Sequence, residues 1–68
     1  MYAKIIEAIK AEFGGEILDA SGIRFEFGGE VFCFTDGTIY LQIDDRFAGV
    51  GSKVKTIAAV KKFVEARI

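Results

Sequence analysis

Histidine and proline are absent from this chain, and Cys33 is its only cysteine. A single cysteine cannot form an intramolecular disulfide, and zinc sites built from cysteine and histidine are excluded. Because no histidine is available to activate Cys33, we expect no cysteine nucleophile. A chain of 68 residues must then draw its stability from a dense apolar core or from a partner subunit. With 51% apolar residues and seven phenylalanines, the sequence can supply such a core.

Long apolar runs are absent as well. No stretch approaches the roughly 18 consecutive apolar residues of a membrane span. The first residues lead into an amphipathic helix pattern rather than a signal peptide, so we expect a cytoplasmic protein without membrane contact. No proline-rich linker, low-complexity tract or internal repeat divides the sequence, which predicts one domain over residues 1–68.

Hydrophobic periodicity predicts a helix at each end of the chain and strands between them. Residues 2–13 carry apolar side chains at helical spacing and are followed by Gly14-Gly15, which is typical of a helix end. For residues 16–19 two alternatives stay open, a short fourth strand or an ordered connection. Residues 44–51 are expected to form a loop. Ser52 is predicted to cap a second helix, whose apolar stripe runs from Val54 to Ile68.

Two predicted hairpin turns, Gly28-Gly29 and Asp36-Gly37, fix the register of the central strands. Both turns give the same core face: Ile23, Phe25, Phe27, Phe32, Phe34, Ile39, Leu41 and Ile43. The opposite face collects Arg24, Glu26, Val31, Cys33, Thr35, Thr38, Tyr40 and Gln42. The predicted fold is therefore a two-layer α+β domain of order α-β-β-β-α. An antiparallel three-stranded meander carries both helices on one face.

The sheet face opposite the core is the leading candidate site. Val31, Cys33 and Tyr40 lie side by side on it, with Arg24 and Gln42 in a polar rim. An apolar centre within a polar rim is typical of a contact surface, although scattered apolar residues also occur on ordinary solvated faces. We predict a non-enzymatic interaction module, without a cofactor, that forms a homodimer or docks a protein partner through this face.

Charge is strongly segregated along the chain, although the formal net charge is only −1. Residues 46–68 contain six bases and one acid, whereas residues 1–45 contain three bases and nine acids. The predicted start of the second helix would offer unpaired backbone N–H groups to an anion. The alternative function is therefore anion or nucleic-acid-backbone binding at Gly51, Ser52, Lys53, Lys55 and Lys62. The same residues also fit a flexible loop, a helix cap and a solvated lysine face.

Three carboxylates, those of Asp36, Asp44 and Asp45, are candidate ligands of a hard cation. Asp36 is accounted for by its turn, and Asp44-Asp45 does not match the spacing of a calcium loop. Neighbouring aspartates after a strand are more often solvated loop residues. We therefore predict no metal site.

A short segment resembles the double-stranded-RNA-binding domain, which shares the order α-β-β-β-α. The residues that carry this resemblance are Gly49, Gly51, Ser52, Lys53 and the pair Ala58-Ala59. In the family's Gly-x-Gly-x-Ser-Lys-Lys motif, Val54 replaces the second lysine, and the alanine pair comes two positions early. The chain also has only Gly28-Gly29 where the family has a longer loop, usually with a histidine. With a pI near 5.3, the resemblance implies shared architecture rather than RNA binding.

Overall fold

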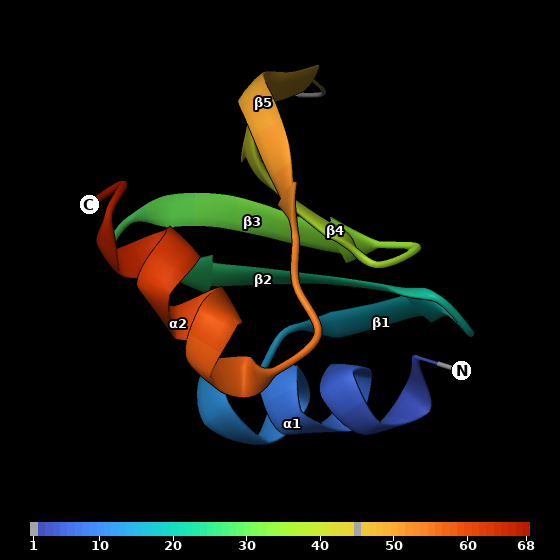
Figure 1. Ribbon diagram of the computed structural model, residues 1–68. Helices are drawn as coiled ribbons and strands as arrows, with labels where there is room; N and C mark the ends of the chain where they lie inside the picture. Colours follow the sequence, from blue (N-terminus) through green and yellow to red (C-terminus); the bar gives the residue numbers. More distant parts are fainter. Residues whose placement is uncertain (1, 45) are drawn as a thin grey trace.

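The computed structural model describes residues 2–44 and 46–68. Its elements are α1 (Ala3–Phe13), β1 (Glu16–Asp19), β2 (Gly22–Phe27), β3 (Glu30–Thr35), β4 (Thr38–Ile43), β5 (Arg46–Lys53) and α2 (Ile57–Glu65). The strands of this described part form one antiparallel meander in the order β1-β2-β3-β4-β5, and the two helices pack together (Figure 1). The α+β class and the meander are confirmed. Residues 16–19 form a strand, which decides between the two alternatives left open for them. The sheet is wider than predicted because β5 is added.

The glycine turns set the register as predicted. Gly28 and Gly29 have φ values of 62° and 83°, and Asp36 and Gly37 have 51° and 89°. Positive φ at both central residues gives a turn whose twist matches that of the flanking strands. Phe25 accordingly pairs with Phe32 across the first turn. Both predicted strand pairings are confirmed.

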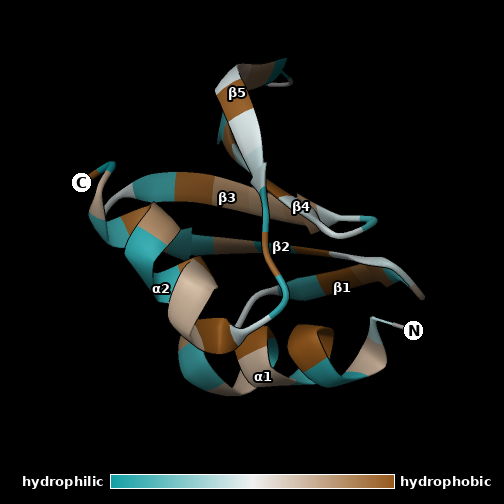
Figure 2. Cartoon of the chain, in the orientation of Figure 1, coloured by the Kyte–Doolittle hydropathy of each residue, from teal (hydrophilic) through white to brown (hydrophobic). Residues whose placement is uncertain are grey.

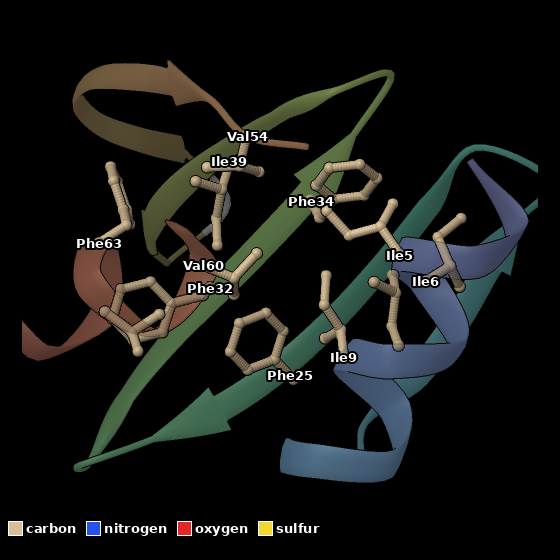
Figure 3. Packing of buried hydrophobic residues seen from close by; sticks show 12 residues of the cluster. Ile5, Ile6, Ile9, Phe25, Phe32, Phe34, Ile39, Val54, Val60 and Phe63 are labelled. Carbon is tan, nitrogen blue, oxygen red and sulfur yellow. The ribbon is translucent and has the colours of Figure 1, made fainter. Parts of the chain in front are cut away.

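The core lies on one face of the sheet and receives residues from both helices. Figure 3 shows these side chains pointing toward one another from the two helices and the sheet. The cluster consists of Ile5, Ile6, Ile9, Ile23, Phe25, Phe32, Phe34, Ile39, Val54, Val60, Phe63 and Val64. Phe27 and Leu41 pack against it while partly buried. Ile43 was predicted in the core, but 51% of its surface is exposed, because the end of the β4–β5 hairpin lies away from the helices (Figure 1).

Four phenylalanine rings connect α1 to α2 across the sheet. Phe13 stacks on Phe25 with ring centroids 4.8 Å apart, and Phe25 stacks on Phe32 at 5.6 Å. Phe63 of α2 completes the row by meeting Phe32 edge-on at 6.2 Å. Offset-stacked and edge-to-face pairs each contribute about 0.5–1.5 kcal/mol beyond the area they bury. This row fixes both helices to the central strands.

The prediction of a loop over residues 44–51 is wrong from residue 46 onward, where the chain forms β5. Ile43 pairs with Arg46, so the chain reverses within two residues, and Asp44 has a φ of 57°. β5 then pairs along β4, but with a bulge: between the pairs Leu41–Ala48 and Ile39–Ser52, β4 advances by two residues and β5 by four. The alternation that marks a strand is broken at this bulge. The glycines there also weaken the strand signal.

The prediction that Ser52 caps the second helix is also wrong. Ser52 pairs with Ile39 inside the sheet. The helix instead begins after Thr56, whose Oγ1 accepts a hydrogen bond from the Ala59 backbone N–H at 3.2 Å. The residues between β5 and α2 include the buried Val54, which belongs to the core. None of the helices in residues 2–44 and 46–68 is long and apolar enough to cross a membrane.

Position 51, in the bulge, has no room for a side chain, and this can be tested by substitution. A Cβ at this position would lie 2.4 Å from Cε1 of Tyr40 and 2.8 Å from Cγ2 of Thr38. We expect Gly51→Ala to lower the free energy of unfolding by about 1–3 kcal/mol, the usual cost of an overpacked site. Urea denaturation would measure the loss.

Gly29→Asn is the matched control for that substitution. Nothing lies within 4 Å of a Cβ at Gly29, and asparagine tolerates its positive φ better than other residues. An unfolding free energy for Gly51→Ala equal to that of the control would contradict the close packing of Tyr40 on β5.

Candidate functional site

The sheet face turned away from the helices contains every predicted contact residue. Cross-strand pairing sets its side chains in two rows, Glu16–Arg24–Cys33–Tyr40 and Glu26–Val31–Gln42–Phe47. We call the residues of these two rows the outer face. The helices lie on the other side of the sheet, so the outer face has no covering layer (Figure 1). The structure therefore brings together Arg24, Val31, Cys33, Tyr40 and Gln42 as predicted, and adds Phe47.

Phe47 forms an aromatic stack with Tyr40. Their ring centroids are 4.3 Å apart and the ring planes differ by 9°. Phe47 is 50% exposed, which is unusual for a large apolar ring, whereas Tyr40 is half-buried between Phe47 and the backbone at Gly51. Sequence reasoning missed Phe47 because residues 44–51 were interpreted as a loop. Asp44, with a φ of 57°, was the available signal, since aspartate tolerates the left-handed backbone of a tight turn.

A groove of about 550 Å³ runs along the end of the outer face near Glu26 and Gln42. Its lining contains three carboxylates, Glu16, Glu26 and Asp44, and one guanidinium, that of Arg24. Arg24 is engaged by Glu16, with 3.0 Å between Nη2 and Oε1. The lining therefore has a formal charge of −2, and we call it the acidic groove.

Cys33 was predicted to contribute to the contact surface, but its side chain is buried in the sheet. Only 5% of its surface is exposed, so it lies beneath its neighbours and offers almost no contact area. Burial raises the pKa of the Cys33 thiol; Arg24 lowers it and Asp19 raises it. The thiol form is thus favoured over the thiolate that a nucleophile requires.

The residues predicted to bind an anion are only partly brought together. Gly51, Ser52 and Lys53 belong to β5, so they do not surround a helix N-terminus. Lys55 precedes the real helix start at Thr56. The predicted anion site depended on a helix N-terminus at Ser52, and the helix does not begin there.

A different groove collects some of these cations. It has a volume of about 350 Å³ and is lined by Ser52, Lys53, Val54, Ala59, Lys62, Phe63, Ala66 and Arg67. We call it the basic groove, because its charged lining residues are Lys53, Lys62 and Arg67. The Arg67 guanidinium lies 3.5 Å from the centroid of the Phe63 ring, and its Nη1 donates to the Phe63 carbonyl at 3.1 Å. Gly51 and Lys55 are not part of its lining.

Residues 2–44 and 46–68 contain no group of three or more His, Cys, Asp or Glu side chains that could hold a metal ion. Within the same residues, every buried side-chain nitrogen and oxygen has a hydrogen-bond partner. Asp45, one of the three candidate cation ligands, lies outside the described residues.

No protein-family model, curated protein or solved structure matches this chain. Its function must therefore be inferred from its own surfaces. The outer face and the basic groove are the two surfaces whose composition points to a ligand.

Burial of Cys33 gives a prediction about stability at alkaline pH. The folded-state pKa of the thiol lies above its ordinary value of 9.0, so the folded chain holds this proton more tightly than the unfolded chain. The resulting stabilisation is complete below pH 9.0 and is lost as the pH rises through the folded-state pKa. Denaturation of the wild type and of Cys33→Ala under reducing conditions would measure the effect. The difference between their unfolding free energies should be constant below pH 9 and shrink above it, and a difference independent of pH would contradict the prediction.

Proposed function

We propose that this chain is a small interaction module that makes protein contacts through the outer face, most simply with a second copy of itself. The observation that carries the proposal is the Tyr40–Phe47 stack, in which half of the Phe47 surface meets water. Covering an apolar surface contributes roughly 25 cal/mol per Å². Tyrosine and phenylalanine are enriched in interfaces, where they act as rigid anchors.

The surroundings of this stack have the composition of a contact surface. Val31 and Gln42 line the part of the acidic groove beside the stack, and Arg24 and Glu16 form an exposed ion pair in the same lining. An apolar centre with hydrogen-bonding groups at its margin matches the usual anatomy of an interface. The module is proposed to be non-enzymatic, since the one thiol on this face is held in its protonated form.

The irregular edges of the sheet favour contact through the face rather than by strand addition. β1 changes register between Ile17 and Asp19, and β5 contains the bulge opposite Tyr40. Figure 2 shows hydrophobic segments on both edge strands, so an uninterrupted edge would be prone to pairing. Bulges twist an edge away from the straight ladder that a new strand requires. The outer face is then the surface available for a specific partner.

Substitution of Phe47 tests the proposal. We expect wild-type protein to associate as its concentration rises, and Phe47→Glu to be monomeric, because the substitution removes the ring and adds a charge at the apolar centre. Sedimentation equilibrium at low and moderate salt would measure the mass. Denaturation would show that the variant remains folded.

Val50→Glu is the matched control. Val50 is on the same strand and is 86% exposed, but it belongs to the bulge and not to the outer face. The control is expected to associate like the wild type. A Phe47→Glu protein with unchanged mass would reject the outer face as the contact surface.

Anion binding is a second candidate function, supported by the clustering of Lys53, Lys62 and Arg67 in one groove whose lining contains no carboxylate. Binding of a nucleic-acid backbone would release counterions and so weaken steeply with salt. Titration with a labelled single-stranded RNA should then show binding at low salt that Lys53→Gln/Lys62→Gln weakens. Identical titration curves for the wild type and this variant would exclude the groove as a nucleic-acid site.

A further inference from the structure

The acidic groove and the basic groove lie on different sides of the molecule. Most of the lining of the acidic groove, namely Glu16, Arg24, Glu26, Val31 and Gln42, belongs to the outer face, and Phe13 of α1 closes one end. The basic groove is instead lined by residues of α2, the residues that follow α2 and the end of β5. The segregation of charge seen along the chain is thus also a segregation in space.

The two grooves do not neutralise each other within one molecule. In residues 2–44 and 46–68 the ion pairs are Arg24–Glu16 and Lys61–Glu12, and neither joins the two grooves. Glu26 and Asp44 on one side, and Lys53 and Lys62 on the other, are exposed to solvent. Their charges are available to a second molecule.

We infer that the partner of the outer face is a second copy of this chain, which places its basic groove against the acidic groove. This inference rests on the proposed function and names its partner. Complementary charges steer two molecules together and fix their relative orientation. Because the two surfaces differ, the contact is head-to-tail, and each added copy leaves a free groove at both ends of the assembly.

The size of the chain explains why the contact extends beyond the charged groups. A stable interface covers roughly 800 Å² of each partner. The described chain exposes 4478 Å² in total, so such an interface covers a little under a fifth of the surface and includes residues outside the groove. The Tyr40–Phe47 stack lies on the same face as the acidic groove, beside Gln42, and supplies apolar area to the same contact.

Two features make the basic groove better suited to a protein surface than to a phosphate group. Four of its lining residues, Lys62, Phe63, Ala66 and Arg67, lie in or just beyond the last turn of α2, where the helix dipole is negative and opposes a compact anion. One Arg67 nitrogen is also committed to the Phe63 carbonyl, which leaves the guanidinium less free to clamp a phosphate. The buried Val54 and Phe63 add an apolar floor to the groove.

Neutralising each groove separately tests the inference. One variant, Lys53→Gln/Lys62→Gln, weakens only the basic groove, and the other, Glu26→Gln/Asp44→Asn, weakens only the acidic groove. Asparagine is chosen at position 44 because it tolerates the φ of 57° found there. Lys4→Gln/Lys55→Gln removes two charges outside the basic groove and serves as the matched control.

Sedimentation at low salt has a specific expected outcome. Wild type and control should form species larger than a dimer as concentration rises, and these should dissociate near 1 M salt, where the Debye length is about 3 Å. Each groove variant alone should be monomeric. An equimolar mixture of the two groove variants should form a dimer and nothing larger, because only one complementary pair of grooves is left intact.

Other outcomes would overturn the inference. A wild type that is monomeric at every concentration, or that stops at a dimer, excludes head-to-tail assembly. Association that survives in both groove variants but is lost in Phe47→Glu would reject the charge pairing while leaving the outer face as the contact surface. Association unaffected by any of these substitutions would reject both proposals. RNA binding that depends on Lys53 and Lys62, without self-association, would assign the basic groove to nucleic acid instead.

Discussion

The row of phenylalanine rings from Phe13 to Phe63 is the interaction on which the rest of the structure depends. It fixes α1 and α2 to the same side of the sheet through Phe25 and Phe32. Cys33 is the only cysteine, so no intramolecular disulfide joins the two ends of the chain. Placing both helices on one side has a direct cost, since the opposite side of the sheet is left without a layer to cover it. The outer face exists because the core is one-sided.

On the uncovered side of the sheet, the packing of Tyr40 depends on the glycine at position 51. The ring of Tyr40 can stack on Phe47 only because Gly51 leaves space where a side chain would otherwise lie. The bulge that contains Gly51 also interrupts the edge of the sheet. One local irregularity therefore shapes the centre of the outer face and protects the neighbouring edge from unspecific strand pairing.

The fold could be predicted where a short-range rule decided the structure. Two-residue turns at Gly28-Gly29 and Asp36-Gly37 admit few backbone geometries, so the register and the inner face followed from them. β5 could not be predicted in the same way. Its bulge breaks the alternation of apolar and polar residues, and its pairing with β4 is not set by a short-range sequence rule. That omission also hid Phe47 and moved the expected helix cap from Thr56 to Ser52. Of the candidate site, sequence alone gave the shared face of Arg24, Val31, Tyr40 and Gln42, but neither groove.

The bulge also affects which partner surfaces can fit against the outer face. Extra residues in β5 increase the local right-handed twist, and the β4–β5 hairpin turns out of the plane of the other strands (Figure 1). A partner of the outer face must follow this change in strand direction. A flat surface that fits β2 and β3 would therefore not also fit the β4–β5 hairpin, so the shape of the hairpin adds a requirement beyond charge and apolar area.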